Sequence, residues 1–376
     1  MKKIALLGAT GSIGQSTIEV IKRHPEEFKV VLASAHSRTE ELLNYGNEIP
    51  IDHFVITGEN GVGISGHPGN IHKGEDALLS LLEEIDYDIM LNAVVGSAGL
   101  KYTVAGLKTG HNIALANKES LVMAGDIITE LAKENHCKII PVDSEHCAIM
   151  QCLESAKDKS HVRRIILTAS GGPFSNLRLE AFKNITLQDA LQHPTWAMGN
   201  KITIDSATMA NKGLEVIEAH HLFNVYYDEI DVLIHPQSVI HSMVEYIDGS
   251  IISQLSFPDM KLPIQYALSY PDRFDATAQY TDLAKIHELT FYKPNFEKFP
   301  LLGMAFEVGK NGGIIPTIFN AANEAAVTLF LQEKIHFIDI PDIVEKELSV
   351  PNIYNPDLET IIEKDKEIKE KIYTNY

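Results

Sequence analysis

Apolar and polar positions in the first 150 residues follow two alternating patterns, one typical of buried strands and one of amphipathic helices. We expect parallel strands joined by helices, that is, a doubly wound α/β sheet, because short β-rich runs and helical segments succeed each other at the spacing of such folds. The predicted strands are Lys3–Leu7, Lys29–Ala33, His53–Ile56, Ile89–Val95, Asn112–Ala116 and Lys138–Val142, and the predicted helices include Gln15–Arg23, Ala77–Glu84 and Ala124–Glu134.

The pattern changes after residue 142. A helix, a strand at Arg164–Thr168 and a helix at Met209–Phe223 are followed by two alternating runs, His241–Ile247 and Ser250–Ser256. The Asp248-Gly249 pair between these runs predicts a hairpin with a type I′ turn. This region is therefore expected to be an α+β domain.

Periodicity is lost between residues 271 and 300, which predicts a linker. Helical spacing returns in Leu302–Val308, Phe319–Glu333 and Leu358–Ile372. We therefore predict a dinucleotide-binding domain over 1–142, a catalytic and connective domain over 143–270, a linker over 271–300 and a C-terminal helical bundle over 301–376.

The charge of the chain limits its partners. The formal net charge of −19 argues against nucleic acid and against an anionic membrane surface, because the field would repel phosphate groups. Any phosphate that binds must find a local pocket rich in basic or N–H groups. The apolar run that follows Met1-Lys2-Lys3 is too short for a signal peptide, and no run is long enough to span a bilayer. Three cysteines without metal-like spacing suggest reduced thiols in a cytoplasmic protein.

A glycine-rich segment follows the first predicted strand. Gly8, Gly11 and Gly14 have the spacing G-x-x-G-x-x-G and lie where a helix begins. Glycines at such a turn let the backbone approach a pyrophosphate, and the helix N-terminus supplies N–H groups. A plain strand–helix turn is the alternative, but the position after the first strand favours a Rossmann-like dinucleotide site.

The end of the second predicted strand indicates which dinucleotide binds. NAD-binding folds place an acidic residue there, whereas this chain has His36, Ser37 and Arg38, with no acid before Glu40. We expect Ser37 and Arg38 to contact a 2′-phosphate, which favours NADPH. An ordinary surface arginine is the alternative.

Two polar segments could hold a cation and an anion. Asp143, Ser144 and Glu145 follow a predicted strand at the edge where such sheets bind ligands, and an all-oxygen ligand set suits Mg²⁺ or Mn²⁺. A helix cap is an equally good interpretation of this turn. Farther along, Asn211, Lys212 and Glu215 share one helical face, which suits a phosphate and a metal, although a solvated ion pair would give the same spacing.

Three further segments are ambiguous when taken alone. Ser170 precedes two glycines that could form an anion-binding nest or a plain loop. His193 lies near Trp196, the only tryptophan, in a segment that suits either a lid or a packed turn. Asn117-Lys118-Glu119 ends the fifth predicted strand, where a lysine could bind substrate or the three residues could simply begin a helix.

Together these motifs resemble the 1-deoxy-D-xylulose 5-phosphate reductoisomerase family. The resemblance covers nearly the whole chain and rests on motifs that occur in the family's order: Gly8–Gly14, Ala116–Ser120, Val142–His146, Ser170–Phe174, His193–Trp196, Asp205–Glu215 and Asn320–Ala326. The chain departs from the family at His36-Ser37-Arg38, where Gly-Lys-Asn is common, and at Ala169, where glycine is usual.

The resemblance implies a cytoplasmic homodimer that converts a small phosphorylated sugar with NADPH and Mn²⁺, Mg²⁺ or Co²⁺. It implies that Asp143, Glu145 and Glu215 hold the metal and that Trp196 lies on a lid. The implied substrate contacts are Lys118, Ser144, Glu145, Ser170, His193, Ser206, Asn211, Lys212 and Glu215. The implied NADPH contacts are Thr10, Gly11, Ser12, Ile13, Asn117, Glu119 and Gly199.

Lys118 and Glu145 are the candidate catalytic groups for proton transfer. Two other functions fit part of the pattern. One is a different NADP-dependent dehydrogenase, acting on a semialdehyde or an amino acid, and the other is an NADP-sensing module without catalysis. Only the reductoisomerase requires a cation.

Overall fold

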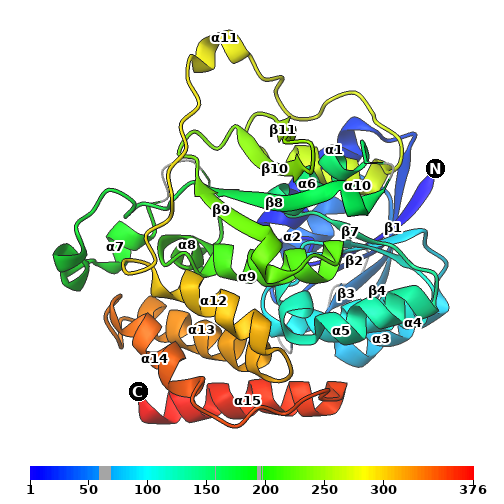
Figure 1. The fold of residues 1–376 in the computed structure, drawn as a ribbon. Coiled ribbons are helices and arrows are strands. Elements are labelled where there is room, and N and C mark those ends of the chain that lie inside the picture. The colour runs from blue at the N-terminus through cyan, green and yellow to red at the C-terminus, as the bar shows by residue number, and fades with distance from the viewer. Residues whose placement is uncertain (59–68, 157, 193–195, 197) are drawn as a thin grey trace. The chain divides into compact units, whose positions relative to one another are not determined.

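A computed structural model describes residues 1–58, 69–156, 158–192, 196 and 198–376 of the chain (Figure 1). The described residues form two compact units, and the structure defines each unit on its own. Unit 1 comprises residues 1–120, 128–147 and 259–280, and unit 2 comprises residues 121–127, 148–258 and 281–376. The units are discontinuous in sequence, whereas the three predicted domains are consecutive ranges; that three-domain division stays a prediction.

Unit 1 is built on a seven-stranded sheet with the order β4-β3-β2-β1-β5-β6-β7, in which every pairing is parallel. The α/β doubly wound fold predicted for this region is confirmed. The strands are β1 Lys2–Leu7, β2 Phe28–Ala35, β3 Ile51–Ile56, β4 Asn70–Lys73, β5 Ile89–Asn92, β6 Asn112–Leu115 and β7 Ile139–Pro141. The chain crosses over between β1 and β5, and this is the switch point at which such sheets bind ligands.

The helices of unit 1 cover this sheet. The early helices are α1 Ser12–Arg23, α2 Thr39–Tyr45, α3 Glu75–Glu84 and α4 Leu100–Lys108, and the strand–helix alternation continues into α5 Lys118–Glu134 and α6 Ser144–Leu153. Residues 121–127 of α5 and 148–153 of α6 belong to unit 2. A later segment, α10 Lys261–Ser269, returns to pack against α1. Lys2 secures this return, because its Nζ donates to the carbonyl oxygens of Leu268 at 2.7 Å and Tyr270 at 3.1 Å.

Unit 2 contains a four-stranded mixed sheet with the order β11-β10-β8-β9. Its strands are β8 Val162–Ala169, β9 Ile230–Ile234, β10 Ile240–Tyr246 and β11 Ile251–Leu255, and β10 runs antiparallel to β8 and β11. The predicted hairpin is confirmed, but its predicted type I′ turn is wrong. A type I′ turn needs two residues with positive φ, whereas in this turn only Gly249 has one, at 85°. Its N–H bonds the Tyr246 carbonyl at 3.0 Å, as in a three-residue loop that closes on a left-handed glycine.

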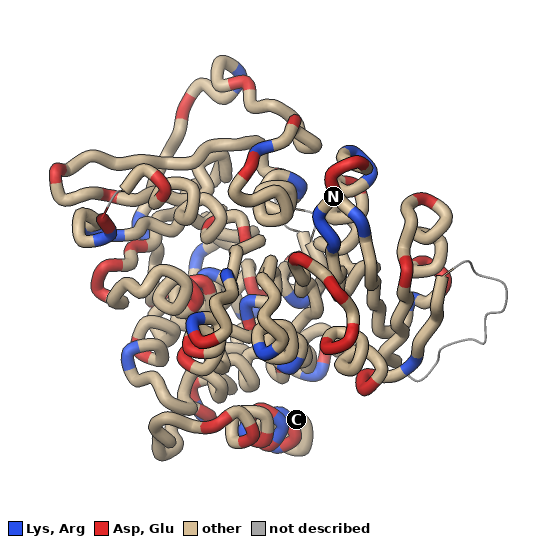
Figure 2. The backbone as a smooth tube through the Cα atoms, turned by 90° about the vertical axis from the view of Figure 1, so that its right-hand side faces the viewer, with Lys and Arg blue, Asp and Glu red and all other residues tan. Residues whose placement is uncertain are grey.

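Helices make up the rest of unit 2. The buried helix α13 Ile315–Leu331 packs against α8 Asn200–Ala207, α12 Pro300–Asn311, α14 Asp339–Glu347 and α15 Leu358–Asn375. The shorter helices are α7 Leu187–Ala190 and α11 Leu283–Ile286, and α9 Ala210–Phe223 packs on α12. Lysine and acidic residues are interspersed along α15, as the blue and red segments of the tube near the C-terminus in Figure 2 show. None of the helices within the described ranges is long and apolar enough to cross a membrane.

Candidate functional site

The glycine-rich segment forms a tight turn between β1 and α1, as predicted. Gly8 has a φ of 77°, and a Cβ built on it would lie 2.6 Å from the Ala93 carbonyl oxygen. A Cβ on Gly14 would lie 2.3 Å from the Ala9 carbonyl oxygen and 2.4 Å from that of Gly8. Only glycine therefore fits at these two positions. Gly11 is the N-cap of α1, and no side chain caps this helix end, so its first N–H groups remain available to an anion.

The end of β2 carries the predicted 2′-phosphate residues. Arg38 is about half exposed, and its Nη1 donates to Glu41 Oε2 at 3.2 Å. Ser37 is exposed, and its carbonyl oxygen accepts the N–H of Thr39 at 3.0 Å. His36 turns to a neighbouring loop, where its Nδ1 lies 3.2 Å from Thr57 Oγ1. Arg38 thus has a defined partner, and most of its N–H donors are left for an anion.

The buried side chain of Asn117 bonds several backbone groups at the start of α5. Its Nδ2 donates to the carbonyl oxygens of Val94 at 2.7 Å and Gly96 at 2.8 Å, and to Glu119 Oε2 at 3.1 Å. Its Oδ1 accepts the backbone N–H of Ser120 at 3.1 Å and so caps the helix. Asn117 therefore fixes the loop that follows β5, next to the switch point of the sheet.

Lys118, the first residue of α5, and Asp143, which directly precedes α6, meet in a largely buried ion pair. Lys118 Nζ donates to Asp143 Oδ2 at 2.5 Å, and the side chains are 7% and 12% exposed. Burial opposes the charged form of Asp143, but the ammonium group of Lys118 outweighs burial and holds the pKa of this carboxyl well below its ordinary value. Asp143 is therefore ionised at neutral pH, as a metal ligand must be.

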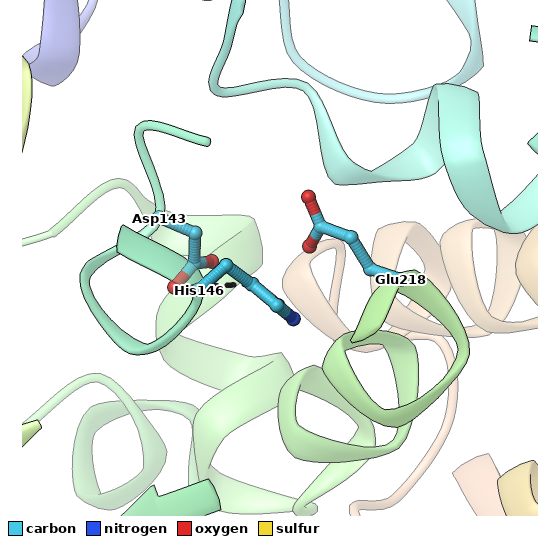
Figure 3. A group of neighbouring side chains, drawn as sticks. All are labelled: Asp143, His146 and Glu218. Atoms are coloured by element: carbon cyan, nitrogen blue, oxygen red, sulfur yellow. Dashed lines mark ion pairs between the residues drawn. The ribbon is translucent and has the colours of Figure 1, made fainter. Parts of the chain in front are cut away.

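The residues after Asp143 begin α6. Ser144 Oγ donates to Glu145 Oε2 at 2.6 Å, and the N–H of Glu145 reaches Asp143 Oδ1 at 3.4 Å. Asp143 therefore also occupies a capping position, the alternative interpretation of this turn. His146 Nδ1 lies 4.0 Å from Asp143 Oδ1, the pair that is dashed in Figure 3. Glu218, also drawn in Figure 3, belongs to α9 of unit 2.

In unit 2, α9 carries the helical face that the sequence predicted. Asn211 Nδ2 donates to Glu215 Oε1 at 2.5 Å, and Lys212 Nζ donates to Glu215 Oε2. Lys212 and Glu215 are 4% and 1% exposed, so the alternative of a solvated ion pair is wrong. A buried ammonium and a buried carboxylate carry a considerable desolvation cost, so this pair is a candidate for a functional role.

The loop that follows β8 reaches the helix before α9. Ser170 Oγ accepts the N–H of Gly172 at 3.2 Å, and Gly172 has a φ of 65°. A Cβ on Gly172 would lie 2.7 Å from the carbonyl oxygen of Ser206, at the end of α8. The structure therefore brings the Ser170 loop against Ser206, so both hydroxyl residues belong to the same region of unit 2.

Asp205, just before Ser206, is a functional candidate that the sequence did not single out. Its carboxylate is 2% exposed, accepts a hydrogen bond from Asn323 Nδ2 at 2.7 Å and forms an ion pair with Lys201 Nζ at 3.0 Å. Asn323 lies in the family-like motif of α13, more than one hundred residues away. The only signal in the sequence was that both motifs resembled the same family.

The lid residues are only partly described. The Trp196 ring lies 6.2 Å from that of His241 in β10, at an angle of 58°. Gly199 is the N-cap of α8, and a Cβ built on it would meet no atom within 4 Å. His193 lies outside the described residues.

The parallel sheet, its switch point and the glycine turn place this chain among dinucleotide-binding α/β proteins. Models of the 1-deoxy-D-xylulose 5-phosphate reductoisomerase family match residues 4–125, and models of that enzyme's C-terminal domains match residues 139–223 and 255–371. The chain belongs to the 1-deoxy-D-xylulose 5-phosphate reductoisomerase family.

Individual relatives agree over nearly the full length. The reductoisomerase of Chloroherpeton thalassium is 51% identical over 92% of this chain and 90% of its own length, and that of Clostridium perfringens is 46% identical over all of both chains. The Zymomonas mobilis enzyme in complex with NADPH has a TM-score of 0.92 and 41% identity, covering 100% of this chain and 98% of its own. A reductoisomerase in complex with NADPH, fosmidomycin and magnesium has a TM-score of 0.95 and 39% identity, with the same coverage.

Proposed function

We propose that this chain is an oxidoreductase that converts 1-deoxy-D-xylulose 5-phosphate to 2-C-methyl-D-erythritol 4-phosphate, with NADPH and a divalent cation, in the non-mevalonate isoprenoid pathway. Family membership over the full length supports this activity, and it disfavours a dehydrogenase of semialdehydes or amino acids. The observation in the structure that carries the proposal is the buried face of α9, where Asn211 and Lys212 converge on Glu215.

NADPH would bind at the switch point of the unit 1 sheet. Thr10, Gly11, Ser12 and Ile13 form the turn that presents backbone N–H groups to the pyrophosphate, and Ser37 and Arg38 would receive the 2′-phosphate. The remaining contacts would come from Asn117, Glu119 and Gly199. When bound, the cofactor supplies the hydride for the reduction.

The cation would be held by Asp143, Glu145 and Glu215. This donor set fits a hard divalent cation, because it consists of carboxylates and because Lys118 keeps Asp143 ionised. Mg²⁺ is the first candidate, with Mn²⁺ and Co²⁺ as alternatives. When bound, such an ion polarises a carbonyl oxygen as a Lewis acid.

The substrate phosphate would be anchored by unit 2. Ser170, Ser206, Asn211 and Lys212 supply hydroxyl, amide and ammonium donors, and the buried Lys212 is the local positive charge that a chain of net charge −19 must provide. Ser144 and His193 would contact the sugar. Binding of the phosphate would stabilise closure of the Trp196 lid, which excludes water.

Protons would be moved by Lys118 or Glu145, each of which is also a proposed substrate contact. Lys118 is 7% exposed and hydrogen bonded to Asp143, so it is held as an ammonium donor aimed at this turn. Glu145 accepts from Ser144 Oγ, which fixes one of its oxygens.

We further propose a homodimer formed through the edge of the unit 2 sheet. Strand β11 ends that sheet, and its Ile251 and Ile252 are 52% and 37% exposed, next to the exposed side chains of Ile247 and Phe257. An edge strand with apolar side chains favours pairing with a second copy. Sedimentation of wild type and Ile251→Lys tests the dimer, since only wild type should sediment as a dimer.

A cytoplasmic location agrees with the three cysteines. All three lie in the described residues, and they are free thiols and not disulfides.

The activity is tested by following NADPH oxidation with 1-deoxy-D-xylulose 5-phosphate and Mg²⁺ and by identifying the product by mass spectrometry and NMR. Oxidation should require both the pentulose phosphate and the cation, and EDTA should stop it. Oxidation that persists in EDTA, or a product other than the methylerythritol phosphate, would refute the proposal.

A further inference from the structure

Four side chains of unit 1 form a connected group around Glu41, which we call the Glu41 network. Glu41 Oε1 accepts from Gln15 Nε2 at 2.8 Å and from Tyr45 OH at 2.9 Å. Glu41 Oε2 accepts from Arg38 Nη1 at 3.2 Å. The network therefore joins α1, which begins in the glycine turn, to Arg38 at the end of β2.

Two members of the Glu41 network, Glu41 and Tyr45, have shifted pKa values. Burial opposes the charged form of Glu41, but hydrogen bonds from Gln15 and Tyr45 and the charge of Arg38 outweigh it, so the pKa of Glu41 lies below its ordinary value. Burial, together with the hydrogen bond to Glu41, raises the pKa of Tyr45 to about 12. Glu41 is thus an acceptor and Tyr45 a donor at every pH at which the enzyme would work.

The Arg38–Glu41 pair leaves Arg38 able to bind an anion. A guanidinium has five N–H donors, and the pair uses one of them. Arginine has many rotamers, and an arginine already held by a carboxylate loses less entropy when a phosphate binds. Against this, a carboxylate near a 2′-phosphate repels it, so orientation of Arg38 and repulsion of the phosphate act in opposite directions.

We propose that Glu41 is a positioning residue that sets the preference of this enzyme for NADPH over NADH by orienting Arg38. The inference rests on the proposed function, in which Arg38 receives the 2′-phosphate. Arg38 compensates the charge of the Glu41 carboxylate, and Gln15 and Tyr45 donate hydrogen bonds to it, so we expect the orienting effect to outweigh repulsion. NADH has no 2′-phosphate, so its binding is independent of the pair.

Glu41→Gln is the discriminating variant. The new amide oxygen can still accept from Gln15 and Tyr45, while its NH₂ group no longer pairs with Arg38. Glu40→Gln is the matched control, because it removes the same charge from an exposed neighbour in α2. Wild type, both variants, Arg38→Ala and the Arg38→Ala/Glu41→Gln double variant are compared by their KM for NADPH and NADH and their kcat, with the pentulose phosphate and Mg²⁺.

We expect Glu41→Gln to raise the KM for NADPH roughly threefold to fivefold while the KM for NADH and kcat stay unchanged. Glu40→Gln should behave as wild type, and Glu41→Gln should add nothing in the Arg38→Ala background. A fall in the KM for NADPH would mean that repulsion dominates, and an equal rise for both cofactors would mean a merely structural role; either overturns the inference. A wild type that does not turn over the pentulose phosphate with NADPH would instead refute the proposed function.

Discussion

Replacing Gly14 by alanine tests the glycine turn at the position where the structure leaves least room. The added Cβ would lie 2.3 Å from the Ala9 carbonyl oxygen, about 1 Å closer than the 3.4 Å at which ordinary contact begins. The obstructing atoms are backbone atoms of the turn itself, so no side-chain rotation relieves the clash. Helix α1 and the turn must move apart by about 1 Å, and the N–H groups proposed to meet the pyrophosphate move with them.

The cost can be estimated from overpacking in protein cores, roughly 1–3 kcal/mol. If the shift falls on the cofactor site, the Kd for NADPH rises roughly 5- to 150-fold, because about 1.4 kcal/mol corresponds to a factor of ten. Alanine's better helix propensity, about 1 kcal/mol, offsets part of the loss in stability. The affinity should therefore suffer more than the free energy of unfolding.

The assay is a fluorescence titration with NADPH, paired with urea unfolding of the same samples. Gly303→Ala in α12 is the matched control, since its Cβ would meet Phe296 Cδ1 at an ordinary 3.5 Å. The control should bind NADPH normally and be slightly more stable. If a folded Gly14→Ala variant bound NADPH as wild type does, our account of the turn would be wrong.

Glu215→Gln is expected to abolish turnover while leaving NADPH affinity near that of wild type, because Glu215 is a proposed cation ligand and not a proposed NADPH contact; normal kcat at saturating Mg²⁺ would contradict the cation assignment. Arg38→Ala should weaken NADPH binding with little change for NADH, and equal losses in titrations with both cofactors would disprove a 2′-phosphate contact. Lys369→Met should lower the free energy of unfolding by roughly 3 kcal/mol, because Glu324 and Asp365 lose the ammonium group that lies 2.5 Å and 2.9 Å away. Burial lowers the pKa of Lys369, but the two carboxylates outweigh burial, so the net shift of this pKa is upward. The stabilisation is therefore complete below the ordinary pKa of 10.5 and is lost as the pH rises through the pKa of Lys369 in the folded protein. The free energies of unfolding of wild type and Lys369→Met, measured in urea, should therefore approach each other only at strongly alkaline pH.

Much of unit 1 could be predicted because its strands are continuous apolar runs bounded by polar residues. The same logic missed α2, whose seven residues are too short to show a period, and α4, whose Thr103, Val104 and Gly106 disfavour a helix. It also placed the start of α5 at Ala124. The helix begins at Lys118 under the Asn117 cap, and Ala124 is where its backbone departs from helical angles.

The candidate site could be predicted where the residues lie close together in the sequence. Helical spacing alone placed Asn211, Lys212 and Glu215 on one face, although only the structure shows that this face is buried. The contact between Asp205 and Asn323 could not be derived, because 118 residues separate them and neither has a local signal of its own. The predicted turn type of the hairpin was wrong because an Asp-Gly pair also fits a three-residue loop that ends in a left-handed glycine.

The central proposal is that Asp143, Glu145 and Glu215 hold one catalytic cation, and a Mn²⁺ titration followed by electron paramagnetic resonance tests it most directly. Wild type should bind Mn²⁺ at a single tight site, and both Asp143→Asn and Glu215→Gln should lose that site while NADPH still binds. Unchanged Mn²⁺ binding in Glu215→Gln would contradict this proposal and would mean that α9 contributes only to the phosphate site.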